Sequence, residues 1–145
     1  MLVKPRDERL GSAFAVLGAE AVAAYDPLTG RELWRTEGTR SHPIPSIVTT
    51  HGLIFATAGS QAKVALAIRP GAVSDEQRIA WRYNKGTAYV PSPIAIGDYL
   101  YLMSDAGLMT ALDARTGAVV NEGGRVPVPA TFRASLVAFG DRILQ

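Results

Sequence analysis

Residues 24–34 read AYDPLTGRELW, and residues 111–121 read ALDARTGAVVN. Both stretches contain Ala-x-Asp-x-x-Thr-Gly followed by a short strand-like run. A degenerate copy lies between them, where residues 67–71 read AIRPG and residues 79–81, after a polar insertion, read IAW. The chain therefore contains a repeat, which has to be recognised before single strands are assigned. The first alanines of the three copies are 43 and 44 residues apart: Ala24, Ala67 and Ala111.

A second set of landmarks repeats with the same period. In each unit a serine precedes a short apolar strand, and a glycine turn then leads into a second apolar strand. The three glycines are 45 and 43 residues apart. Two independent sets thus agree on a period near 44 residues, within the range of about 40–50 residues for a four-stranded propeller blade. The serines are Ser46, Ser92 and Ser135, and the glycines are Gly52, Gly97 and Gly140.

Within each unit the strand signals are short and are separated by turn residues. In the third unit the sequence predicts four strands, at residues 94–96, 99–103, 109–113 and 118–121. Glycine and aspartate occupy the connections, because glycine accepts a positive φ and aspartate can bond its own backbone. Helical periodicity of useful length is absent, so the predicted class is all-β.

The repeats predict a partial β-propeller of four-stranded antiparallel blades. About three periods are too few to close a ring, since propellers have about 4–8 blades. We therefore expect a segment of a larger ring of about seven or eight blades, in which the remaining blades are needed for closure. The expected parts are the end of a blade at 14–38, full blades at 45–86 and 91–125, and the start of a blade at 134–145.

The repeated residues have structural roles in this interpretation. The aspartates are expected to accept backbone N–H bonds inside the turn, and the glycines to adopt the left-handed conformation. The tryptophans lie on outer strands, where a large flat ring can pack against the neighbouring blade. One acid that recurs at the same turn of separate blades indicates structure rather than catalysis. These motif residues are Asp26, Gly30, Trp34, Trp81, Asp113 and Gly117.

Composition excludes several classes of function. Hydrophobic residues make up 48% and charged residues 19% of the chain, a globular balance. The formal net charge of +2 is too small to predict binding to nucleic acid or to an anionic membrane. There is no cysteine, which excludes disulfides, cysteine-bound zinc, iron–sulfur clusters and a thiol nucleophile within these residues. No apolar run approaches the ~20 residues of a membrane helix.

The sequence predicts no metal site and no catalytic residue. The two histidines, His42 and His51, are nine residues apart on different turns and match no zinc spacing. No Gly-x-Ser-x-Gly motif is present, and the repeated serines have a structural explanation because they recur at one place in the repeat.

A ligand or partner site is expected at the loops that enter the innermost strands, since ligand sites tend to occupy the mouths of such folds. The candidate residues are His42, Tyr89 and Arg133. The alternative is that Tyr89 and Phe132 simply pack between blades. The insertion at 71–78 is either a partner contact or a solvated loop.

The signature at residues 24–34 resembles the repeat of the pyrroloquinoline-quinone-type (PQQ-like) propellers. That group includes the quinoprotein alcohol dehydrogenases and the bacterial outer-membrane assembly propeller lipoproteins. The resemblance extends over about residues 14–145. Two positions depart from it, because Asn121 stands at the tryptophan position of the third blade and Arg69 at the turn aspartate of the second. These departures concern the regularity of blade packing.

The resemblance implies a non-catalytic scaffold that binds a protein or another ligand in the bacterial cell envelope, in the periplasm or at the outer membrane. It implies no cofactor in that case. The alternative is a segment of a quinoprotein oxidoreductase that uses pyrroloquinoline quinone and Ca²⁺, so enzymatic activity stays open, with the non-catalytic interpretation favoured. A third possibility is the sensor domain of a signalling protein.

Overall fold

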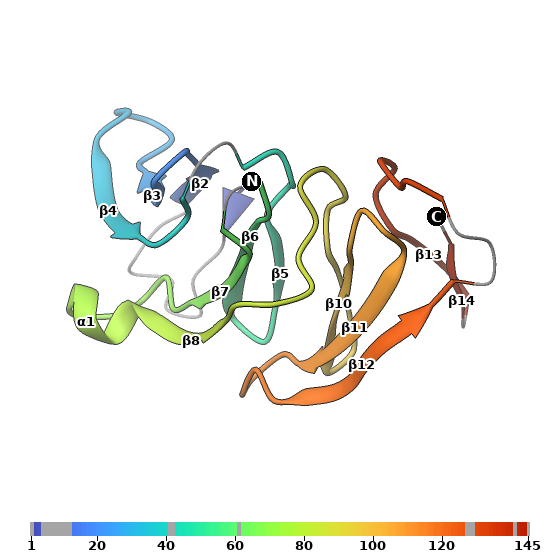
Figure 1. The fold of residues 1–145 in the computed structure, drawn as a ribbon. Helices are drawn as coiled ribbons and strands as arrows, with labels where there is room; N and C mark the ends of the chain where they lie inside the picture. The colour runs from blue at the N-terminus through green and yellow to red at the C-terminus, as the bar shows by residue number, and fades with distance from the viewer. Residues whose placement is uncertain are drawn as a thin grey trace.

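The structure is a computed structural model that describes residues 2–3, 13–40, 43–60, 62–126, 130–140 and 142–144. Its strands form four separate antiparallel sheets, each made of strands that are consecutive in the sequence. The sheets follow one another across the molecule from the N-terminal end to the C-terminal end (Figure 1). This arrangement confirms the predicted fold class, an all-β partial propeller.

Sheet 1 contains a strand that the sequence pattern did not reveal. Its order is β1-β2-β3-β4, and β1 pairs with β2 through Leu2 opposite Phe14. The prediction for this part began at residue 14, because two residues are too short a stretch for a strand pattern to show. The strands are β1 (Leu2–Val3), β2 (Ala13–Leu17), β3 (Ala21–Tyr25) and β4 (Glu32–Glu37).

Sheets 2 and 3 repeat this order from the inner to the outer strand. Sheet 2 carries a four-residue helix in the connection before its last strand, and no helix of the described residues is long and apolar enough to cross a membrane. Sheet 2 comprises β5 (Val48–Thr50), β6 (Leu53–Ala58), β7 (Val64–Ile68), α1 (Asp75–Arg78) and β8 (Ile79–Tyr83). Sheet 3 comprises β9 (Ile94–Ile96), β10 (Tyr99–Met103), β11 (Leu108–Asp113) and β12 (Val119–Arg125). Sheet 4 pairs β13 (Val137–Phe139) with β14 (Arg142–Leu144).

In each of the first three sheets the outer strand pairs with the third strand in the same register. The alanine of each repeat pairs with the same outer position, which is Trp34 in sheet 1, Trp81 in sheet 2 and Asn121 in sheet 3. In all three sheets the register then shifts directly after that alanine. A bulge at the same place in each sheet twists the outer strand in the same way, so the sheets are conformational copies of one another.

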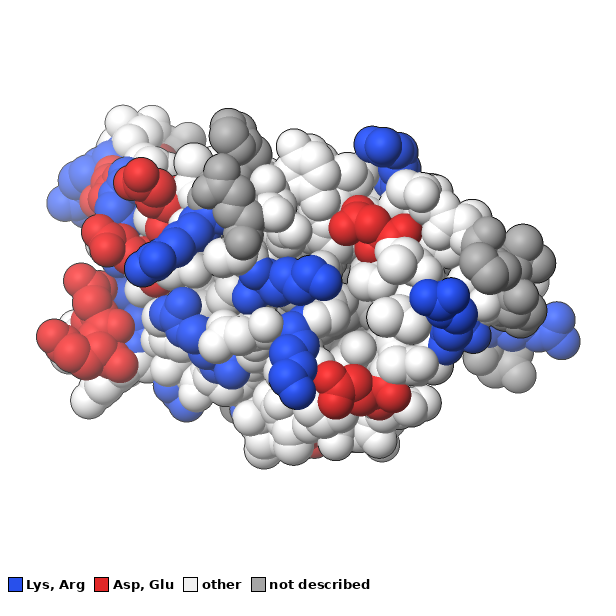
Figure 2. Space-filling model, in the orientation of Figure 1, with Lys and Arg blue, Asp and Glu red and all other residues white. Residues whose placement is uncertain are grey.

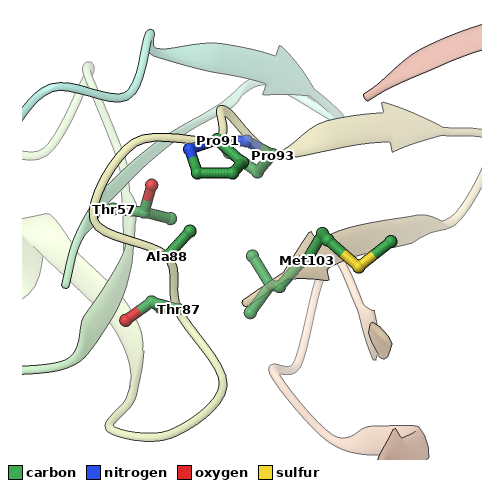
Figure 3. Close-up of a pocket in the computed structure, with 7 residues that line it drawn as sticks. Thr57, Thr87, Ala88, Pro91, Pro93 and Met103 are labelled. Atoms are coloured by element: carbon green, nitrogen blue, oxygen red, sulfur yellow. The ribbon is translucent and has the colours of Figure 1, made fainter. Parts of the chain in front are cut away.

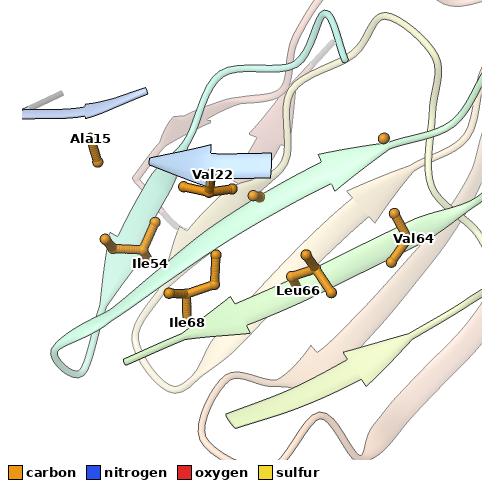
Figure 4. Close-up of a cluster of buried hydrophobic side chains, with 8 residues drawn as sticks. Ala15, Val22, Ile54, Val64, Leu66 and Ile68 are labelled. Carbon is orange, nitrogen blue, oxygen red and sulfur yellow. The ribbon is translucent and has the colours of Figure 1, made fainter. Parts of the chain in front are cut away.

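The core lies between neighbouring sheets, because side chains alternate between the two faces of each strand. The first cluster joins Ala15 and Val22 of sheet 1 to the even-numbered positions of β6 and β7, including Ile54 and Leu66 (Figure 4). The second joins the opposite face of sheet 2, represented by Phe55, to sheet 3. Sheet 2 is thus covered on both faces, and its strand β7 is buried along its whole length.

The repeated aspartates organise the turns between the third and fourth strands. The Oδ1 atom of Asp26 accepts the N–H groups of Leu28 and Thr29, and that of Asp113 accepts those of Arg115 and Thr116. These two hydrogen bonds lower the pKa of Asp26 below its ordinary value of 3.8, and the bond from Thr29 has a larger effect than the bond from Leu28. The pKa of Asp113 is also lowered, chiefly because the N–H and the hydroxyl of Thr116 both donate to its carboxylate.

The outer tryptophan of sheet 2 packs on the turn of sheet 3. Its indole Nε1 donates to the carbonyl oxygen of Ala114 at 3.0 Å. Gly117, with φ +74°, lies directly against the ring, so that a Cβ at this position would be only 2.6 Å from Cδ2 of Trp81. The glycine of the repeat therefore serves both the turn conformation and the contact between sheets.

Sheet 2 lacks the aspartate turn, and its insertion supplies the packing instead. The guanidinium of Arg78 stacks over the Trp34 ring at 4.9 Å from its centroid. Arg78 is buried, and it bonds Asp75 Oδ1 and the carbonyl oxygen of Pro70. Arg69, at the aspartate position, donates to the carbonyl oxygen of Gln77. Two arginines thus hold the inserted loop and preserve the contact with sheet 1.

Candidate functional site

The loop that carries Tyr89 is anchored by the next sheet. The backbone N–H of Tyr89 donates to Asp105 Oδ2 at 2.9 Å, and that of Val90 donates to Asp105 Oδ1 at 3.4 Å. Asp105 lies in the turn between β10 and β11. The Asp105 carboxylate thus holds the backbone of this loop, and the Tyr89 side chain is 36% exposed.

The same turn anchors the loop that carries Arg133. The N–H of Phe132 donates to the carbonyl oxygen of Asp105 at 2.9 Å. The Phe132 ring packs so closely on Gly107 that a Cβ there would be 2.6 Å from Cε2 of the ring. Arg133 is exposed. The turn of sheet 3 therefore brings the loops of Tyr89 and Arg133 together, while the third candidate, His42, lies outside the described residues.

The repeated serines connect the same loops closer to the innermost strands. The backbone N–H of Ser46 donates to Ser92 Oγ at 2.8 Å, and that of Ser92 donates to Ser135 Oγ at 3.1 Å. Each serine lies two residues before the innermost strand of its sheet. The hydroxyls thus form a ladder across sheets 2, 3 and 4 that holds the entering loops in register.

The hollow below the Tyr89 loop is closed. It is lined by two threonines, two prolines and apolar side chains of β10, and it has no room for a water-sized occupant (Figure 3). Thr57 Oγ1 is buried there without a hydrogen-bond partner, whereas Thr87 Oγ1 donates to the carbonyl oxygen of Ala58 at 2.8 Å. This place packs the loop onto the sheets.

His51 joins sheets 2 and 3 at the turns between their first and second strands. Its Nε2 atom is 3.0 Å from both the carbonyl oxygen of Gly97 and Oδ1 of Asp98. Its Nδ1 atom is 3.1 Å from Nη2 of Arg115. Because arginine can only donate, Nδ1 accepts and Nε2 carries the proton in this arrangement. The sequence predicted a loop histidine but did not reveal these partners, which lie 46 and more residues away.

The described residues do not bring together a set of ligands for a metal ion. Among them, no three His, Asp or Glu side chains cluster closely enough to hold one.

Both signs of charge are present on the face seen in Figure 2. Acidic groups gather toward the end formed by β4 and α1 and also occur beyond the middle, and basic groups are scattered over the whole face. Lys85 and Glu122 form an ion pair whose closest atoms are 3.9 Å apart. Groups of opposite sign are interspersed on this face, so it does not present a continuous field of one sign.

Solved structures share this architecture. The BamB structure from Moraxella catarrhalis matches with a TM-score of 0.69 and 17% identity, over 91% of this chain and 38% of that one. A computationally designed protein, Ika8, matches with a TM-score of 0.65 and 12% identity, over 98% and 40% of the two chains. A europium-containing methanol dehydrogenase matches with a TM-score of 0.55 and 15% identity, over 76% of this chain and 22% of that one. The chain spans less than half the length of each, and these identities show the fold alone.

The family assignment comes from the sequence. No curated protein matches the chain. The family described as "Outer membrane protein assembly factor BamB" matches residues 10–122, which is most of the chain. The matched residues include the repeats of sheets 1 and 2 and most of sheet 3. The resemblance that the Asp-x-x-Thr-Gly turns suggested is confirmed, and the chain belongs to this family of PQQ-like propeller repeat proteins.

Proposed function

We propose that the protein is a non-catalytic propeller scaffold of the bacterial cell envelope, which binds another protein through the face that carries Tyr89 and Arg133. The observation that supports it most is the double attachment of the loops to Asp105, through its carboxylate and through its carbonyl oxygen. A surface held in place before binding loses little conformational freedom when a partner docks. Family membership supports a role in assembly at the outer membrane.

The two side chains suit a protein partner. Tyrosine and arginine are among the residue types that contribute most to protein–protein binding, because each offers a large contact area with a polar end. Tyr89 is 36% exposed and Arg133 is exposed, although the loops that carry them are fixed. The Arg133 guanidinium is a cation that only donates hydrogen bonds, and the Tyr89 hydroxyl can also donate, so an acidic or carbonyl-rich partner segment fits best.

Photo-crosslinking tests this proposal in the bacterium that carries the gene. A photoreactive amino acid at position 89 or 133 should give a discrete adduct with one envelope protein, which mass spectrometry identifies. Leu28 is the matched control, because it is 94% exposed in the turn between β3 and β4. Adducts at 89 and 133 that are no more abundant than those at 28 would contradict the proposed binding face. Recovery of the protein in the cytoplasmic fraction would contradict the envelope assignment.

A further inference from the structure

His51 departs from the repeat at the boundary between sheets 2 and 3. The pairing of the flanking strands places it at the turn position that Gly97 occupies in sheet 3 and Gly140 in sheet 4. All three residues have a positive φ, which is +51° for His51, and His51 is the one non-glycine residue with a positive φ in the part of the chain that the structure describes. This conformation costs free energy in a residue with a Cβ. The side chain is therefore retained here for its contacts.

The two ring nitrogens of His51 make contacts with opposite requirements. Nδ1 lies 3.1 Å from Nη2 of Arg115 and has to accept, because a guanidinium only donates. Nε2 lies 3.0 Å from Oδ1 of Asp98 and donates to it. The same Oδ1 atom is 3.2 Å from Nη1 of Arg115. The neutral imidazole thus links the turn before β10 to the turn before β12.

The surroundings of the imidazole contain few other charges. Arg115 is also a departure from the repeat, since the corresponding residue of the first Asp-x-x-Thr-Gly turn is Leu28. The carboxylate of Asp113 accepts N–H groups of its own turn. Among the described residues, Asp98 and Arg115 are the charged groups that contact the ring. The His51 side chain is 22% exposed, so protons from the solvent reach it.

We propose that His51 is a pH-sensitive switch, which binds Arg115 while its ring is neutral and releases Arg115 when the ring is protonated. Histidine is the side chain whose charge ordinarily changes between about pH 5 and 8. A protonated ring carries a hydrogen on Nδ1, and arginine offers no acceptor for it. Asp98 accepts from Nε2 in both states. The turns of sheets 2 and 3 therefore stay joined while the guanidinium leaves.

Protonation changes the charge that this corner presents to the solvent. The three side chains, His51, Asp98 and Arg115, have no net formal charge while the ring is neutral and one positive charge after protonation. The released guanidinium is then available to an anionic group. The corner lies at the opposite ends of the innermost strands from the entering loops. The switch is thus independent of the proposed binding face.

A double-mutant cycle on the full chain at two pH values tests the switch, because it isolates the interaction of one pair. The variants are His51→Asn, Arg115→Met and the double variant, and asparagine is chosen because it tolerates a positive φ. Urea denaturation at about pH 8 should show a coupling of about threefold in the unfolding equilibrium constant. At about pH 5 this coupling should vanish or change sign. Equal coupling at both pH values, or none at the higher one, would overturn the proposal.

The ion pair of Glu32 and Arg35 supplies a matched control cycle. Arg35 Nη2 lies 2.6 Å from Oε2 of Glu32, and its hydrogen bond lowers the pKa of Glu32 below the ordinary value of 4.5. Both groups therefore keep their charges at the two pH values. The coupling between Glu32→Gln and Arg35→Met should be the same at both. An equal loss of coupling in this control would show a general effect of acid and would also count against the switch.

NMR of the native chain provides a second test that needs no substituted protein. At the higher pH the imidazole of His51 should carry its proton on Nε2. On acidification Nδ1 should become protonated, and the guanidinium signals of Arg115 should shift with the same midpoint. A proton on Nδ1 at the higher pH, or Arg115 signals that do not follow the titration of His51, would refute the proposal.

Discussion

The backbone N–H of Ser46 donates to the hydroxyl oxygen of Ser92 at 2.8 Å, across the boundary between sheets 2 and 3. The next bond of the same kind runs from Ser92 to Ser135 at 3.1 Å. A serine that recurs once per repeat is thus a link between blades. Its side chain satisfies a backbone donor of the preceding sheet, so the loops that enter the sheets are positioned by the repeat itself.

Replacement of Ser92 by alanine should lower the free energy of unfolding by about 1 kcal/mol, because the Ser46 N–H loses its acceptor. Urea denaturation followed by circular dichroism measures the change. Ser60→Ala, at an exposed position in the turn between β6 and β7, is the control and should leave the midpoint nearly unchanged. Equal effects of the two substitutions would show that the ladder does not contribute.

Gly117→Ala should destabilise the protein more than Gly30→Ala. Both glycines have a positive φ, +74° and +71°, so both substitutions carry a similar backbone cost of about 1–2 kcal/mol. At Gly117 the new Cβ also meets the Trp81 ring, whereas at Gly30 no described atom lies within 4 Å of it. The difference between the two unfolding free energies measures the contact between sheets. A larger loss for Gly30→Ala would contradict the packing described for Trp81.

Thr57→Val should stabilise the protein by about 1 kcal/mol, because it removes a buried hydroxyl without a partner and keeps the shape of the side chain. The corresponding positions of sheets 1 and 3 hold Leu17 and Met103, which are already apolar. Thr87→Val is the matched control and should destabilise by about 1 kcal/mol, because its hydroxyl bonds Ala58. Thermal melts of the two variants should therefore shift in opposite directions.

Arg78→Met should cost about 2 kcal/mol, since it removes the cation over Trp34 and the bonds that hold the inserted loop. Arg78→Lys should recover only part of this loss, because an ammonium group lacks the planar fork of the guanidinium. Gln77→Ala is the control, as its side chain is exposed and its carbonyl oxygen still accepts from Arg69. Tryptophan fluorescence during denaturation reports the change, and a midpoint for Arg78→Met equal to that of Gln77→Ala would refute the role of Arg78.

The Asp113→Asn variant should lose less stability in acid than the native protein does. The folded pKa of Asp113 lies below its ordinary value of 3.8, so the carboxylate stabilises the fold above that value. This contribution disappears as the pH falls through the lower, folded pKa. Asparagine can still accept the turn bonds but does not titrate in this range. Melting temperatures measured from neutral pH to below pH 3.8 should fall less for the variant, and parallel curves would contradict the prediction.

Much of the candidate face could be predicted from the repeat, because loops at corresponding positions of stacked sheets must lie at one end of the molecule. Tyr89 and Arg133 were placed there on that ground, and their role in binding stays a prediction. The role of Asp105 in holding the neighbouring loop could not be predicted in this way. An aspartate in a turn usually bonds its own backbone, as Asp26 does, and only packing shows that Asp105 bonds the neighbouring loop.

The sequence by itself determined the period of the repeat, the turns at Asp26 and Asp113 and the all-β architecture, because turn chemistry and strand alternation act between residues close together in the chain. The tertiary structure alone decided which groups meet across the sheets. Arg78 replaces the missing aspartate turn by stacking on Trp34, and His51 finds its partners in Asp98 and Arg115. These contacts join residues more than 40 positions apart, and they form only when whole sheets pack face to face.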